Sequence, residues 1–206
     1  MRSCFLKLIL CWGLTLSGVA AQQPWYWNVS LGYGRGTHED FRLSVDFVLP
    51  NRLTLSGMTG HLERTAPQKP ADYRQGLCVW DNCEPRLQMN AYGILGGRAI
   101  ALRPFLRLNL RGGLAVNTLE EPIHFQPNPP DPCNLASNYR YDKKHTVNAG
   151  FVVEPRLELM AAHTLGIALG GFAHINKTNP AFGVFLDLLG GWRLRNRQKG
   201  KPAGPQ

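Results

Sequence analysis

Two histidines stand beside residues that could support hydrolysis. His61 follows Thr59 by two residues and precedes Glu63 by two, and His174 precedes Asn176 by two. A histidine between an acid and a hydroxyl is the arrangement that activates a nucleophile, but it is defined by geometry and not by spacing. Asn176 stands where the second set would need its nucleophile. We therefore assign no catalytic residue. An enzymatic role for His61 or His174 is kept as an alternative, which depends on where the fold places their side chains.

The first 21 residues are expected to be a secretory signal peptide. Arg2 and Lys7 give a positive start, residues 8–16 are mostly apolar, and small residues precede Gln22. The apolar run is shorter than the roughly 20 residues of a spanning helix. The expected organisation is a signal peptide at 1–21, one folded domain at 22–195 and a basic tail at 196–206.

The exported chain would keep Cys78, Cys83 and Cys133. Export permits a disulfide, and three thiols allow three pairings. The short segment with an Asp-Asn turn between Cys78 and Cys83 favours that pair, which leaves Cys133 unassigned. These cysteines and His124 lack the CxxC or HxxxH spacing of zinc sites. No metal and no cofactor site is expected.

The formal net charge of +9 is concentrated at the two ends of the chain. Two basic residues lie in the first ten positions and five in the last fourteen, and without these seven the rest carries +2. A nucleic-acid surface needs Lys and Arg clustered along one element. Nucleic acid is therefore excluded as a partner.

Strict alternation of apolar and polar residues runs through most of the chain and predicts strands. It is clear at 41–47, and at 106–116 leucines alternate with Arg107 and Arg111. Leu87, Met89 and Ala91 begin the fourth of eight such segments. The segments reach the ~9–11 residues that a tilted membrane strand needs.

The connections between these segments differ in length. Tight turns are expected at 50–51, 103–104 and 161–163, and long polar connections at 64–85 and 118–144. Short turns at one end and longer loops at the other are typical of up-and-down transmembrane barrels. The sequence therefore predicts an all-β fold, an eight-stranded antiparallel up-and-down transmembrane β-barrel with short periplasmic turns and longer extracellular loops.

The lysines favour an apolar outer surface over the alternative, a soluble periplasmic lipocalin-like barrel with an apolar ligand inside. A water-facing sheet normally carries Lys on several strands. Here every lysine after the signal is expected in a loop or the tail. These are Lys69, Lys143, Lys144, Lys177, Lys199 and Lys201.

The strand charges share the polar face, where opposite signs could pair inside a narrow barrel. They are Arg42, Asp46, Arg107, Arg111, Glu154, Arg156, Glu158 and Asp187. Counted from the short-turn end, Arg107 is level with Glu158, and Arg111 with Glu154. We expect a lumen charge network in which strand six reaches strand five, with a structural and not a catalytic role.

Aromatic residues gather at the ends of the first and last segments, at Trp25, Tyr26, Trp27 and Trp192. Such residues are expected at the membrane interface. A carbohydrate-binding platform is the alternative for this group.

With its signal, eight alternating segments, short turns and aromatic ends, the chain resembles the small outer-membrane β-barrel proteins of Gram-negative bacteria, the OmpA/OmpX-like class. The resemblance covers roughly residues 23–195 and rests on architecture. It implies a monomeric barrel in the outer membrane after signal-peptide export, with outer-membrane lipid around it. Family members often end in an aromatic residue, whereas this chain continues into the basic tail.

The resemblance implies a structural or adhesive protein. Eight strands leave an interior just wide enough for side chains, so a general pore is not expected. Loops 64–85 and 118–144 carry aromatics and prolines and could contact an extracellular ligand or surface. The enzymatic alternative is a lipid-modifying barrel similar to a lipid A deacylase, using His61 or His174.

Overall fold

The computed structural model describes residues 26–76, 84–129, 137–161 and 165–193, and these form eight strands. The strands are β1 (Tyr26–Gly36), β2 (Glu39–Val48), β3 (Leu53–Thr65), β4 (Arg86–Arg103), β5 (Leu106–Pro127), β6 (Tyr139–Met160), β7 (Leu165–Asn176) and β8 (Ala181–Arg193). No helix among the described residues is long and apolar enough to cross a membrane.

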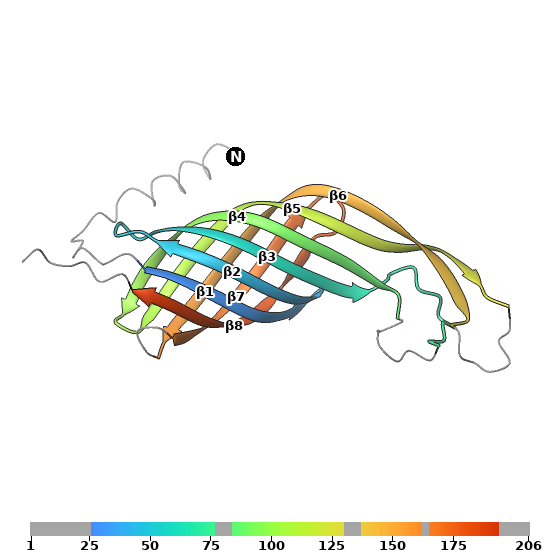
Figure 1. Ribbon diagram of the computed structural model, residues 1–206, viewed down its shortest axis with the longest axis horizontal. Coiled ribbons are helices and arrows are strands. Elements are labelled where there is room, and N and C mark those ends of the chain that lie inside the picture. Colours follow the sequence, from blue (N-terminus) through green and yellow to red (C-terminus); the bar gives the residue numbers. More distant parts are fainter. Residues whose placement is uncertain (1–25, 77–83, 130–136, 162–164, 194–206) are drawn as a thin grey trace, which may run out of the picture.

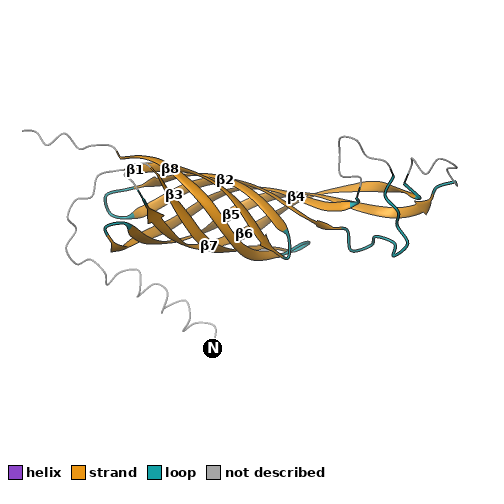
Figure 2. Cartoon of the chain, turned by 90° about the horizontal axis from the view of Figure 1, so that it is seen from below, coloured by secondary structure: helices purple, strands orange, loops and turns teal. Residues whose placement is uncertain are grey.

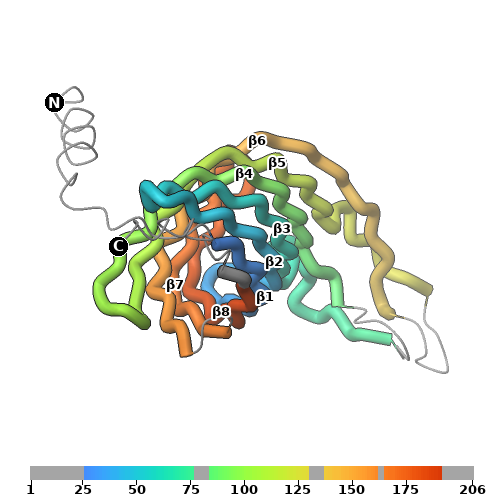
Figure 3. Tube along the Cα trace, turned by 60° about the vertical axis from the view of Figure 1, so that its left-hand side comes forward, coloured from blue at the N-terminus to red at the C-terminus, as the bar shows by residue number. Residues whose placement is uncertain are grey.

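Each strand pairs antiparallel with the next, and β1 pairs with β8, so the sheet closes into a barrel. The tilted strands wrap around the barrel axis in Figure 2, and Figure 3 shows β1 and β8 side by side. The expected all-β, eight-stranded, antiparallel up-and-down barrel is confirmed.

The two ends of the barrel differ. At the turn end, β2 reaches β3 through residues 49–52, and β4 reaches β5 through residues 104–105. The first of these turns is closed by a 2.8 Å hydrogen bond from the Leu49 amide to the Leu53 carbonyl oxygen, with Arg52 at a φ of 67°. At the loop end lie the longer connections 66–85 and 128–138.

The prediction of a long connection at 118–144 is wrong, because most of this segment is strand. β5 and β6 remain paired from Thr118 opposite Val147 to Pro127 opposite Tyr139, with one register shift. β4 stops pairing with β5 at Gln88, and β7 stops pairing with β6 at Asn176. Figure 1 shows the resulting hairpin projecting beyond the barrel.

This hairpin also corrects the expected placement of the lysines. Lys143 and Lys144 belong to β6 and are exposed beyond the end of the barrel. Prolines and charges interrupt the alternation here, but backbone hydrogen bonding to the facing strand does not depend on it.

The outward-facing side chains of the barrel wall are apolar and the inward-facing ones are largely polar. Within the wall, Phe41, Leu43 and Phe47 of β2 are exposed, whereas Arg42 and Asp46 are buried. A soluble lipocalin-like barrel has the reverse arrangement, with its apolar face inside. That alternative does not fit this wall.

The interior is layered along the barrel axis. Charged and amide side chains fill much of the turn-end half and the middle, where they lie beside a smaller apolar cluster of Met58, Leu95, Ala115 and Val152. Toward the loop end, an apolar layer of side chains from β3, β4, β5, β7 and β8 meets across the lumen. Its members are Leu62, Leu87, Met89, Ala91, Leu119, Phe172, Ala181 and Phe185. Leu87, Met89 and Ala91 thus follow the strand alternation but lie inside the barrel.

The described strands run from Tyr26 to Arg193, inside the domain expected at 22–195. The signal peptide at 1–21 and the tail at 196–206 lie outside the described residues. Both remain predictions, as does the Cys78–Cys83 bridge, since residues 77–83 and 130–136 also lie outside.

Candidate functional site

All eight charged residues expected in the lumen lie on the inner face of their strands. Seven are buried, with 3% or less of each residue exposed, and Arg107 is partly buried near the turn end. The strand alternation places them there, because each shares its parity with small or amide residues such as Ser44 and Asn109. The barrel wall therefore holds the charges in fixed register.

The centre of the network is Glu154 on β6, which accepts two guanidinium groups. Its oxygens lie 2.7 Å from Arg111 on β5 and 2.8 Å from Arg42 on β2. Arg111 and Glu154 are also direct partners in the strand register. Arg111 contacts Asp46 as well, so this level joins β2, β5 and β6 across the lumen.

A second level lies nearer the turn end. Glu158 is 3.1 Å from Arg107 and 2.7 Å from Arg156, and the amide of Asn109 donates to it at 3.0 Å. Arg156 also contacts Asp46, which links the two levels. Arg107 lies opposite Glu158 in the register, and the structure brings these two together.

A glycine makes room for the last carboxylate. Asp187 on β8 faces Gly32 on β1 and lies 3.8 Å from Arg156. A Cβ atom on Gly32 would stand 1.7 Å from an Asp187 carboxylate oxygen. Gly32 therefore permits a close approach that no larger residue would allow at this point.

Arg42 joins the charged network to the apolar layer. Its guanidinium lies 4.0 Å from the ring centre of Phe185 and 4.6 Å from that of Phe172. It also pairs with Asp40. A buried guanidinium between two aromatic faces and two carboxylates has its charge compensated on every side.

Asp40 was missed by the sequence reasoning, which recognised this strand only from Phe41 onward. It shares its parity with Arg42 and Asp46, and that signal could have found it. With Asp40 included, the network of ion pairs joins four arginines (Arg42, Arg107, Arg111, Arg156) and five carboxylates (Asp40, Asp46, Glu154, Glu158, Asp187). Such a network packs and orients the strands.

The four expected interfacial aromatics do not form one group. Trp27 faces outward and its backbone pairs with Trp192, whereas Trp25 lies outside the described residues, as does the Trp192 side chain. The expectation for Tyr26 is wrong: its ring lies 4.5 Å under the Arg107 guanidinium. Tyr26 has the parity of Asn28, so the alternation turns it into the lumen.

The two histidine sets do not form a nucleophilic site. His61 faces outward on β3, and its ring nitrogens lie 2.7 Å from Asn90 and 2.7 Å from Glu63. With both nitrogens engaged, neither can accept a proton from Thr59. His174 is buried in the lumen beside Phe172, where a membrane lipid could not reach it.

No group of three or more His, Cys, Asp or Glu side chains in the described part of the chain is placed to hold a metal ion.

At the loop end, residues 66–76 dock on the β5–β6 hairpin. The Asn138 side chain accepts from the Arg74 amide at 2.6 Å and donates to the Asp72 carbonyl oxygen at 2.9 Å. The Tyr139 hydroxyl donates to the Asp72 carboxylate at 3.0 Å, and this bond raises the pKa of Tyr139. The Tyr73 and Tyr139 rings stack 6.4 Å apart. Two segments far apart in sequence thus form one surface.

Comparison with known proteins supports the architecture. No family model matches the chain, and no curated protein matches its sequence. The N-terminal β-barrel domain of Pseudomonas aeruginosa OprF is similar in structure, with a TM-score of 0.55 at 9% identity over 82% of this chain and 98% of that one. The likeness to OprF confirms the expected fold resemblance to the small OmpA/OmpX-like barrels.

Two further solved structures are similar at lower scores. Neisserial surface protein A has a TM-score of 0.46 at 8% identity, over 81% of this chain and 92% of its own. The Yersinia pestis outer membrane protein Ail, in a phospholipid bilayer nanodisc, has a TM-score of 0.46 at 11% identity, over 81% and 99%.

Proposed function

We propose that this protein is a monomeric outer-membrane barrel of a Gram-negative bacterium, exported by its signal peptide, with a structural or adhesive role. The observation that carries the proposal is the division of its wall. Exposed apolar side chains cover the outside, while ion pairs and an apolar layer fill the lumen. A lipid environment makes such an outer surface favourable, because so large a contiguous apolar surface would be costly to expose to water.

The extracellular role is assigned to the loop-end surface formed by residues 66–76 and the projecting β5–β6 hairpin. Beyond Gln88 and Asn176 the hairpin has no neighbouring strand among the described residues. Its faces carry charges and aromatics, which suits recognition of a ligand or surface outside the cell.

Membrane insertion is tested by fractionation and gel mobility. The full-length chain should stay in the outer-membrane pellet after a carbonate wash and change its mobility when boiled. Release into the soluble periplasmic fraction with no change of mobility would contradict the proposal.

Adhesion is tested by shortening the hairpin. Glu120 and His145 face each other in the register, so an Asn-Gly turn can join them and replace residues 121–144. Bacteria producing the shortened chain should bind a cultured epithelial monolayer less well than those producing the whole chain. Equal binding, with equal amounts of folded barrel in the membrane, would assign the protein a purely structural role.

A further inference from the structure

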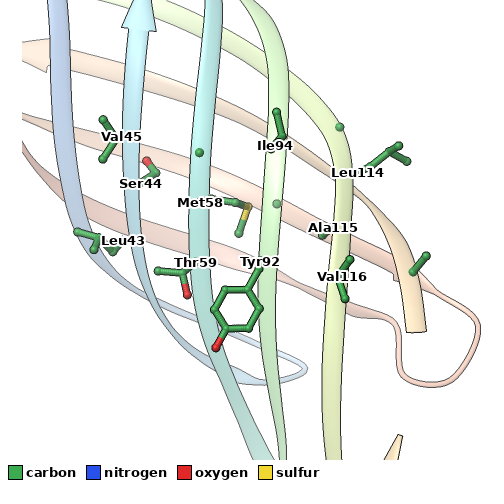
Figure 4. Close-up of a pocket in the computed structure, with 14 residues that line it drawn as sticks. Leu43, Ser44, Val45, Met58, Thr59, Tyr92, Ile94, Leu114, Ala115 and Val116 are labelled. Carbon is green, nitrogen blue, oxygen red and sulfur yellow. The ribbon is translucent and has the colours of Figure 1, made fainter. Parts of the chain in front are cut away.

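A groove crosses the outer wall of the barrel over β2 to β5. Its volume is about 1060 Å³, just above the roughly 300–1,000 Å³ of small-molecule pockets. Two successive outward rows of the register line it: Leu43, Thr59 and Tyr92 in one, and Val45, Gly57 and Ile94 in the next. Figure 4 shows these side chains from β2, β3 and β4 around the groove.

The floor of the groove is Gly57. A Cβ atom built there would meet no other atom within 4 Å, so the space above the backbone is open. Ile94, its register partner on β4, stands beside it with 70% of the residue exposed, and Leu114, the next along the row on β5, is 72% exposed. The space above this bare backbone, with aliphatic side chains projecting beside it, suits a hydrocarbon chain in width and chemistry.

The groove changes character toward the loop end. Thr59 and Tyr92 lie side by side there, and Figure 4 shows both hydroxyl oxygens directed toward that end. The next outward pair on the same two strands is His61 and Asn90, hydrogen-bonded to each other at 2.7 Å. An apolar trough thus leads directly to a shelf of hydroxyl, imidazole and amide groups.

We propose that this groove binds one acyl chain of a membrane lipid, with the polar head of that lipid held by the Thr59 and Tyr92 hydroxyls and the Asn90 side-chain amide. The inference rests on the proposed membrane insertion and adds a preferred lipid position to it. A chain lying along Gly57 buries apolar surface on three sides, whereas a chain against the convex remainder of the wall is covered on one.

The test compares two glycines that differ in one respect. Gly57 and Gly96 both face outward, and a Cβ atom at either would meet nothing within 4 Å. Gly57 lines the groove and Gly96 does not. Gly57→Leu fills the floor, and Gly96→Leu is the matched control with the same added volume on the neighbouring strand.

The full chain and both variants are refolded into phosphatidylcholine vesicles. A small fraction of the lipid carries a photoactivatable diazirine on one acyl chain, and labelled peptides are mapped by mass spectrometry. Peptides around Gly57 should carry more label than the outward face of β8 near Leu188. Gly57→Leu should lower this excess of label over β8 about tenfold, the loss of burial for roughly two methylene groups, and Gly96→Leu should leave it unchanged.

Three outcomes would overturn the proposal. Even labelling around the barrel, indifferent to Gly57→Leu, would leave membrane insertion intact and remove the preferred site. Absence of lipid label from the groove, together with crosslinks there between two copies of the chain, would make the groove a dimer contact. No label on any outward strand would mean that the proposed membrane location itself is wrong.

Discussion

At the residue scale, Glu154 has the most demanding position in the lumen. It is fully enclosed and paired with both Arg42 and Arg111, so removing its charge leaves two buried guanidinium groups undercompensated. Breaking a buried pair from one side typically costs roughly 3–5 kcal/mol. Glu154→Gln should lower the free energy of unfolding by this order, measured by urea titration of the chain in lipid vesicles.

The control for this change is a carboxylate at the rim. Glu120 lies 3.3 Å from Lys143 and is one-third exposed, and surface pairs of this kind contribute at most about 1 kcal/mol. Glu120→Gln should therefore shift the urea midpoint little. Equal shifts for the two variants would mean that the lumen pairs do not stabilise the barrel.

Gly32 tests how tightly the network is packed. A Cβ atom there would meet the Asp187 carboxylate and, at 2.8 Å, the Leu186 carbonyl oxygen. Gly32→Ala must push Asp187 away from Arg156 or shift β8, at a cost of about 1–3 kcal/mol. Gly190→Ala, where a Cβ atom has nothing within 4 Å, should leave the urea midpoint almost unchanged. A tolerated Gly32→Ala would argue against the close approach of β1 and β8.

At the element scale, the hairpin and residues 66–76 hold each other in place. Asn138→Ala removes the two side-chain hydrogen bonds to the backbone of Asp72 and Arg74. Trypsin should then cut after Arg74 faster, while the heat-dependent mobility of the barrel stays the same. Gln126→Ala, which removes the bonds to Arg140 within the hairpin, should not change the rate after Arg74. Unchanged cleavage in Asn138→Ala would show that this docking is not stabilising.

The same docking contact should respond to alkaline pH. Because the protonated Tyr139 hydroxyl donates to Asp72, its pKa is raised above the ordinary tyrosine value of about 10. The contact is therefore fully present below that ordinary value and is lost as pH rises through the raised one. The absorbance of tyrosinate above pH 10 should lose the contribution of one tyrosine in Tyr139→Phe, while the pKa of Tyr73, which burial also raises, keeps a second late group in the titration. A late titration of the same amplitude in that variant would contradict the raised pKa of Tyr139.

The elements that the sequence predicts well are those with one apolar and one polar face. In 41–47 every second residue is large and apolar, and that pattern determines the strand, its facing and its register. The hairpin beyond Thr118 escaped because both of its faces meet water, so no alternation marks it. Met89 and Tyr26 escaped because an apolar residue can face the lumen when others meet it across the barrel, and that contact depends on the closed fold.

At the scale of the whole molecule, the lumen is closed by two different layers in series. The charged levels around Arg111 and Glu154 occupy the middle beside a smaller apolar cluster, and the apolar layer containing Met89 and Leu119 lies toward the loop end. Opening one layer leaves the other intact. We therefore expect no steady ion current from the wild-type barrel in a planar lipid bilayer, in contrast to porins with about 16 strands.

Variants of each layer should show this series arrangement. Arg111→Ala alone, or Met89→Ala with Leu119→Ala, should remain non-conducting, because water and ions still meet one filled layer. The three changes together should produce measurable current, provided the heat-dependent gel mobility shows that each variant is folded. A current from Arg111→Ala alone equal to that of the triple variant would mean that the apolar layer does not close the barrel. The charge network would then be its single barrier to ions.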